Sequence, residues 1–127
     1  MQYIDRLIDL ASSEGLWINQ RLVYNQNGDV IGRIEIHMLD EHYVNVNLIA
    51  IYPEFRKQGY FNQLISLMVR AADMNGDAIQ LIPMETESKE IPSSGISNEK
   101  LKSIYEKYGF VAEFPEMPIT SFTRESK

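Results

Sequence analysis

The chain has 127 residues, which suits a single domain over residues 1–127, and its hydrophobic content of 44% is enough for a packed core. The net charge of −6 argues against nonspecific nucleic-acid binding, which needs a broad basic surface. Without cysteine there is no disulfide, thiolate metal site or cysteine nucleophile. No apolar run reaches transmembrane length, and the acidic, mixed N-terminus is unlike a signal peptide. We therefore expect a cytoplasmic protein without metal, membrane or nucleic-acid partners.

The first half of the chain predicts one helix and then strands. An apolar stripe from Ile4 to Ala11 has helical spacing, and Asn27-Gly28 is typical of a hairpin turn. We expect a helix over residues 2–12, an extended segment from Trp17, and strands over 21–25, 29–38 and 44–52. The last three strands should form an antiparallel meander.

The central stretch predicts a buried strand, a sharp basic turn and a long helix. Pro53 ends the strand, because proline cannot continue the hydrogen-bond ladder. The turn covers residues 54–59, and the helix then runs to Gly76, a typical C-terminal glycine. Its apolar face is expected to consist of Phe61, Leu64, Ile65, Met68, Ala71 and Ala72.

The remainder predicts one more helix between short strands. A helix crossover makes the strand at 78–83 parallel to the central strand. Ser97 or Asn98 caps the following helix. We expect a loop over 84–95, a helix ending near Tyr108, strands over 110–113 and 119–124, and a loop over 114–118.

The basic turn has the chemistry of an anion site. A helix start leaves backbone N–H groups unpaired, and its dipole favours negative charge. Gly59 permits a close approach of the ligand, and Arg56 and Lys57 add positive charge. A phosphate or pyrophosphate fits such a turn. The alternative from these residues alone is a solvated basic helix start, which is about as frequent.

Two motifs resemble those of the GCN5-related N-acetyltransferase (GNAT) family. Motif A is written Gln/Arg-x-x-Gly-x-Gly/Ala, and here it is Arg56-Lys57-Gln58-Gly59-Tyr60-Phe61, with Phe61 in place of a small residue. Motif B is written Asn-x-x-Ala-x-x-x-Tyr-x-Lys-x-Gly-Phe, and residues 98–110 follow it except at Leu101. The resemblance covers roughly residues 29–110, with both motifs in the right order.

The resemblance implies an α/β (α+β) fold of the GNAT acyl-CoA acyltransferase type: a central mixed sheet flanked by helices, here shortened at the N-terminus. It also implies that acetyl-CoA is the acyl donor and an amine the acceptor. The pyrophosphate would lie on the turn and the pantetheine arm beside the central strand. The implied cofactor-binding residues are Ile49, Ile51, Arg56, Lys57, Gln58, Gly59, Tyr60, Phe61 and Asn98.

Tyr105 is the implied catalytic residue, because the tyrosine of motif B often protonates the departing CoA thiolate. A positioned general acid can raise the rate by roughly 10²–10⁴. The alternative is a core tyrosine, since Leu101, Ile104 and Tyr108 share its helical stripe.

The sequence names no general base. The strand position that holds a glutamate in some family members offers Asn45 and Asn47 instead, which can orient water or an acceptor. Other candidates are Glu35, His37, His42, Glu85 and Glu87. His37 has a suitable ordinary pKa, although a solvated strand residue is the simpler interpretation. We expect a base that acts through water.

Phe61 leaves two interpretations open. It either crowds the phosphates or turns inward to anchor the apolar face of its helix, and the second fits the stripe better. Three functions follow: an active N-acetyltransferase, a catalytically weak relative that binds CoA or a protein partner, or an unrelated phosphate-binding module. The acceptor is an amine of a small molecule, peptide or protein, and a homodimer through exposed strands is open.

Overall fold

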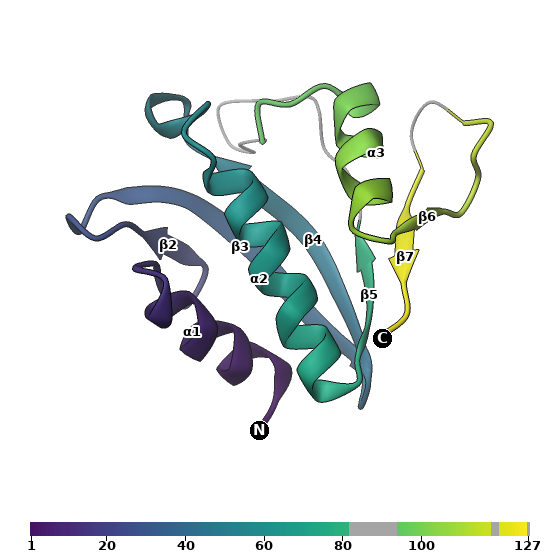
Figure 1. Cartoon of the computed structure of the whole chain (residues 1–127), viewed down its shortest axis with the longest axis horizontal. Helices are drawn as coiled ribbons and strands as arrows, with labels where there is room; N and C mark the ends of the chain where they lie inside the picture. The colour runs from purple at the N-terminus through teal and green to yellow at the C-terminus, as the bar shows by residue number, and fades with distance from the viewer. Residues whose placement is uncertain (82–93, 118–119, 127) are drawn as a thin grey trace.

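The computed structural model describes residues 1–81, 94–117 and 120–126, in which three helices pack against one sheet (Figure 1). The helices are α1 (Tyr3–Ser13), α2 (Tyr60–Asn75) and α3 (Asn98–Lys107), with a short 3₁₀ turn at Pro53–Phe55. The strands are β1 (Trp17–Asn19), β2 (Leu22–Tyr24), β3 (Val30–Asp40), β4 (Tyr43–Ile51), β5 (Ala78–Leu81), β6 (Val111–Ala112) and β7 (Phe122–Arg124). None of the helices described is long and apolar enough to cross a membrane.

The sheet has the order β1-β2-β3-β4-β5-β7-β6, and only the β4–β5 pair is parallel. That pair confirms the crossover predicted from the α2 stretch. All three helices share one hydrophobic cluster with the same sheet face (Figure 1). The predicted apolar face of α2 is buried there, and Gly76 ends the helix in the left-handed conformation. The mixed sheet with flanking helices confirms the expected fold class.

Three predicted boundaries need correction. Trp17–Asn19 is a full strand that pairs with β2, so the meander has four strands rather than three. The strand expected over 110–113 is reduced to two residues, and that over 119–124 to Phe122–Arg124. Such short strands give too few residues for an alternating pattern to reveal their ends. The loop expected over 84–95 lies mostly outside the described residues.

A β-bulge in β4 changes which side chains face the helices. Ile36 pairs with Val46 and Glu35 with Leu48, so that Asn47 has no partner on β3. Val44 and Val46 belong to the hydrophobic cluster before this point, and Ile49 and Ile51 belong to it afterwards. The extra residue therefore shifts the alternation by one position, as a bulge does. Along the described chain, β4 beyond Val46 pairs only with β3.

A buried ion pair joins the last strand to α2. The Arg124 guanidinium donates to both carboxylate oxygens of Asp73, at 2.8 and 2.9 Å, and its Nε donates to the carbonyl oxygen of Tyr108 at 2.8 Å. The Arg124 side chain is only 3% exposed, whereas that of Asp73 is 30% exposed. This one side chain thus fixes β7 against both α2 and the end of α3.

We expect Asp73→Asn to lower the free energy of unfolding by about 2–3 kcal/mol, because it leaves the Arg124 charge buried without its counter-ion. Urea denaturation measures this change. Glu106→Gln, at an exposed position of α3, is the matched control and should have little effect. An Asp73→Asn protein as stable as the wild type would contradict a structural role of the pair.

Candidate functional site

The backbone between β4 and α2 forms an open helix start. Lys57 has φ +65°, and Gly59, the residue before α2, has φ +86°. No side chain caps α2, its first turn contains no acidic residue, and the first helical bond runs from the Gln63 N–H to the Gly59 carbonyl oxygen. The N–H groups of Tyr60, Phe61 and Asn62 therefore lack helical acceptors. The turn presents the donors that an anion would need.

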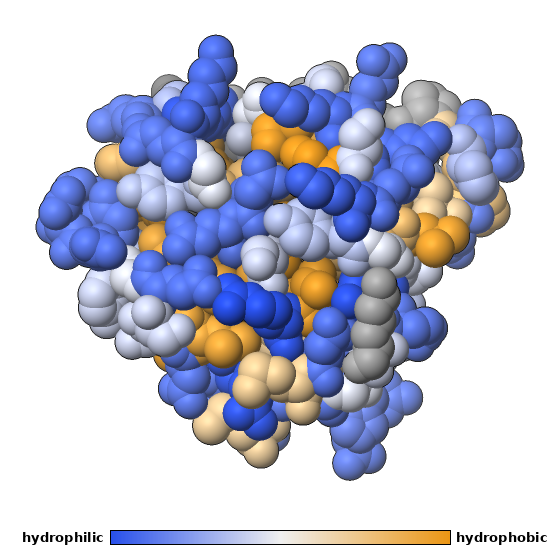
Figure 2. Space-filling view, in the orientation of Figure 1, coloured by the Kyte–Doolittle hydropathy of each residue, from blue (hydrophilic) through white to orange (hydrophobic). Residues whose placement is uncertain are grey.

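A groove of about 260 Å³ opens between this turn and the beginning of α3. Ile51, residues 55–57 and residues 59–62 form one wall, and residues 94–97 with Lys100 and Ile104 form the other. In Figure 2 a small apolar area ringed by hydrophilic side chains is visible in the upper part of the molecule, between these two elements. Of the charged side chains described along the groove, all are cationic: Arg56, Lys57 and Lys100. The groove is thus positive in a chain of net charge −6.

Lys100 was not anticipated as a site residue. It lies one helical turn after Ser97, whose side-chain oxygen accepts a hydrogen bond from the Lys100 N–H at 3.3 Å. Ser97 is thus the N-cap of α3, as predicted. The only sequence signal for Lys100 is its position in the first turn of α3, where a cation opposes the helix dipole.

Arg56 is committed to the protein's own backbone. Its Nε donates to the carbonyl oxygen of Ile51, the last residue of β4, at 2.7 Å. A side chain at Gly95 would collide with it, because a Cβ there would lie 2.4 Å from the Arg56 Nε. Arg56 thus connects the end of β4, the turn and the loop before α3. It adds positive charge beside the turn while its Nε is held by the backbone.

The predicted cofactor-binding residues are partly brought together. Ile51, Arg56, Lys57, Gly59, Tyr60 and Phe61 line the groove, whereas Ile49, Gln58 and Asn98 do not. The Gln58 amide donates to the Glu54 carbonyl oxygen at 3.3 Å. The Asn98 Oδ1 is buried at the start of α3 and has no hydrogen-bond partner among the described residues. A buried acceptor of this kind needs an outside donor, so Asn98 suits a polar ligand.

Tyr105 and Phe61 pack together in the aromatic part of the core. The Tyr105 ring lies 6.3 Å from Phe61, 5.8 Å from Phe110 and 5.2 Å from Phe122, measured between ring centroids. Tyr105 is 3% exposed and Phe61 6%. Burial raises the pKa of the Tyr105 phenol, so that it stays protonated at neutral pH. The Phe61 ring thus points into the core and leaves the turn before α2 open. Tyr105 does not line the groove, whereas the preceding residue, Ile104, does.

The general-base candidates are scattered. Glu35 is bound by Arg21 and Arg33, each at 3.2 Å, and His42 by Asp77 at 2.9 Å. His37 is exposed on β3 directly opposite Asn45. The Asn45 Oδ1 is buried without a partner in the described part of the chain, a position suited to orienting a polar ligand. Glu85 and Glu87 lie outside the described residues. No three His, Asp or Glu side chains within the described ranges gather as a metal would require.

Residues 17–112 match the family model described as an acetyltransferase (GNAT) domain. The chain belongs to the GNAT family. The match covers β1 to β6, including the groove and both motifs. A search of curated proteins finds no match.

Solved acetyltransferase structures share this fold. Ard1 from Thermoplasma volcanium is 17% identical with a TM-score of 0.57, covering 95% of this chain and 78% of its own. The spermidine/spermine N-acetyltransferase SpeG from Vibrio cholerae, solved in mutant forms, is 20% identical with a TM-score of 0.59; the match covers 82% of this chain and 62% of SpeG. YhbS from Escherichia coli, solved in complex with CoA, is 14% identical with a TM-score of 0.53, covering 97% and 67%. This GNAT chain thus spans less than two thirds of SpeG.

The position of Phe61 in this GNAT domain predicts how its variants behave. Phe61→Gly should lower the free energy of unfolding by about 4–6 kcal/mol, because it removes a core ring and places glycine in a helix. Phe61→Leu keeps most of the volume and should cost about 1–2 kcal/mol. Urea denaturation distinguishes the two. A glycine variant as stable as the leucine variant would mean that Phe61 contributes little to the core.

Proposed function

We propose that this chain is an N-acetyltransferase that moves the acetyl group of acetyl-CoA to an amine. The observation that carries the proposal is the groove at the start of α2, with three cations, no described carboxylate and three N–H groups without helical acceptors. These are the properties expected of a pyrophosphate site. Family membership supports acetyl transfer, and the presence of CoA in the YhbS structure supports the choice of donor.

Acetyl-CoA would lie along the groove and β4. The pyrophosphate would accept from the N–H groups of α2's first turn, close to Lys57 and Lys100. The pantetheine arm would run beside β4, near Ile49 and Ile51. The Asn98 side chain supplies a buried acceptor at the start of α3. Acetyl-CoA contributes a thioester, whose carbonyl carbon is open to attack by an amine.

In the proposed reaction an unprotonated amine nitrogen bonds to the thioester carbonyl carbon, and the carbon–sulfur bond then breaks. The CoA sulfur leaves as a thiolate and takes the proton of the Tyr105 phenol. The raised pKa of Tyr105 keeps that proton in place before the reaction. It also makes the phenol a weaker acid than a thiol, so that the proton transfer to the thiolate is uphill. Within the described residues its hydroxyl forms no hydrogen bond, which leaves the proton available for transfer. The amine proton leaves to water, with Asn45 as a candidate for orienting that water, and the Tyr105 phenolate regains a proton from the solvent.

The second candidate function is a GNAT-fold protein with weak or no catalysis that binds CoA or a protein partner. Two observations favour it: Tyr105 is enclosed by three aromatic rings, and Glu35 and His42 are both committed to ion pairs. Binding of acetyl-CoA is common to the enzyme and to a CoA-binding relative, and transfer to amines separates these two. The acceptor class and the cytoplasmic location remain predictions from the sequence.

Calorimetry with acetyl-CoA tests the donor site. We expect micromolar binding, weakened about fivefold by Lys57→Asn, which removes the charge of a lysine near the phosphates. Asparagine tolerates the left-handed conformation of residue 57, so stability should change by less than about 1 kcal/mol. Lys102→Gln, on an exposed part of α3, is the control and should bind as the wild type does. No binding by the wild type would overturn the acetyltransferase and leave only a relative that binds a protein partner.

Steady-state kinetics with an amine panel test the role of Tyr105. Tyr105→Phe retains the ring packing, so the free energy of unfolding should change by less than about 1 kcal/mol. If the phenol is the general acid, kcat should fall about 100-fold while the KM for acetyl-CoA stays within about twofold. Tyr108→Phe, on the same helix, is the control. Unchanged kcat in Tyr105→Phe would leave Tyr105 as a core residue only.

A further inference from the structure

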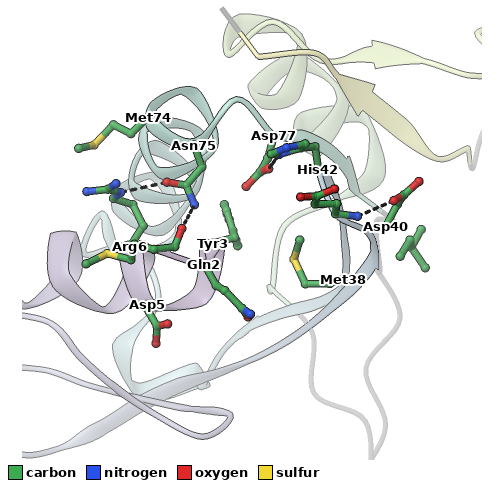
Figure 3. A pocket seen from close by; sticks show the side chains of 13 residues that line it. Gln2, Tyr3, Asp5, Arg6, Met38, Asp40, His42, Met74, Asn75 and Asp77 are labelled. Atoms are coloured by element: carbon green, nitrogen blue, oxygen red, sulfur yellow. Dashed lines mark hydrogen bonds and ion pairs between the residues drawn. The ribbon is translucent and has the colours of Figure 1, made fainter.

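A second and larger hollow lies at the opposite end of α2. Its volume is about 950 Å³, and its walls are the start of α1, the end of α2 and the turn between β3 and β4 (Figure 3). Because α2 has 16 residues, the hollow is separated from the groove by about 24 Å at 1.5 Å per residue. Neither family motif contributes a residue to it. We define it by Asp5, Met38, Leu39, Asp40, Glu41 and Met74 and call it the lower hollow.

Exposed apolar side chains concentrate at the lower hollow. Among the described residues, eight large apolar side chains are exposed, and four of them line this one hollow: Met1, Met38, Leu39 and Met74. Pale orange side chains gather at the lower edge of Figure 2, on the side of the N-terminus. Methionine is flexible and polarisable, and it is over-used on surfaces that receive other polypeptides. Such a concentration on a small domain indicates an interaction surface.

The charge of the lower hollow is negative. Asp5, Asp40, Glu41 and Asp77 line it, against the cations Arg6 and His42. Both cations already have partners: the Arg6 Nε donates to the Asn75 Oδ1 at 3.1 Å, and the His42 Nδ1 lies 2.9 Å from the Asp77 Oδ1. No ion pair neutralises Asp5, Asp40 or Glu41 within the described chain. The C-terminal end of α2 adds partial negative charge, since its last turn contains no basic residue.

The walls of the lower hollow are held in place by contacts of their own. Asp77 is buried, and its bond to His42 fixes the β3–β4 turn to the segment that follows α2. The Ala78 N–H donates to the His42 carbonyl oxygen at 2.9 Å, and the Asn75 amide donates to the Met1 carbonyl oxygen at 2.9 Å. Figure 3 shows the Arg6–Asn75 and His42–Asp77 pairs on either side of the opening. The surface is therefore largely formed before any partner arrives, which lowers the entropic cost of binding.

We propose that the lower hollow is the docking site for a short basic, amphipathic segment of a partner protein. Its apolar side chains would contact Met38, Leu39 and Met74, while its lysine or arginine side chains would pair with Asp5, Asp40 and Glu41. Charge complementarity selects this occupant, because an acidic or purely apolar segment would leave the three carboxylates unpaired. The proposal does not depend on the proposed function, since the lower hollow shares no lining residue with the groove.

Fluorescence anisotropy tests the proposal with two probes, a short helix-forming peptide of leucine and lysine and its counterpart of leucine and glutamate. We expect the basic peptide to bind in the micromolar range and the acidic one not to bind. Amide shifts of the ¹⁵N-labelled protein should concentrate at residues 38–42 and 74–78. Failure of the basic peptide to bind, or shifts spread over the whole surface, would overturn the proposal.

Matched variants locate the interaction. Asp40→Asn with Glu41→Gln should weaken the basic peptide about tenfold, whereas Glu99→Gln with Glu106→Gln on α3 removes the same charge and should change binding less than about twofold. Met74→Gln, at an exposed helix position, should also weaken it. Equal losses of peptide affinity in the two double variants would mean that the peptide is attracted to the acidic protein as a whole and does not dock at the lower hollow. If sedimentation shows that the chain forms a dimer and that the peptide dissociates it, the surface binds a second copy of the chain instead.

Discussion

One extra residue in β4 sets the position of the groove. With Asn47 left out of the pairing to β3, the side chains of Ile49 and Ile51 face the helices. Without the bulge, Leu48 and Ala50 would occupy that face, and every later side chain would change sides. The turn that follows begins from this register, and the Ile51 carbonyl oxygen holds Arg56. The open start of α2 therefore depends on a local irregularity in the strand before it.

Backbone groups and side chains have different roles in the groove, and the motif sequence alone does not show which has which. Arg56, the first fixed residue of motif A, binds the Ile51 carbonyl oxygen, whereas the donors proposed for an anion are backbone N–H groups. Phe61 departs from the motif, but its side chain does not obstruct the turn, because the ring lies in the core beside Tyr105. A site built from backbone donors tolerates such a substitution when the side chain has somewhere else to pack.

The sequence predicted most of the fold, and the physical reasons for the misses are specific. Strong local signals worked: Gly76 ends α2, Ser97 caps α3, and the crossover makes β5 parallel. The bulge was invisible because residues 48–51 are apolar on both faces, so the pattern cannot show a shift in alternation. Arg124 near the chain end gave no hint of burial, since its partner Asp73 lies 51 residues away in the sequence. Lys100 joins the groove for the same reason: tertiary contacts bring α3 beside the turn.

The charged residues near the two ends of α2 have the same sign as the helix dipole at each end, the opposite of the arrangement that stabilises a helix. Acidic residues at the start and basic residues at the end would offset the dipole, but α2 has neither in those turns. Instead, cations surround its positive end and carboxylates its negative end. Each end is thus left uncompensated, a cost that a bound ligand of opposite charge would remove. The two proposed sites would therefore take ligands of opposite sign about 24 Å apart, so that an anionic donor and a basic partner segment would bind without competing.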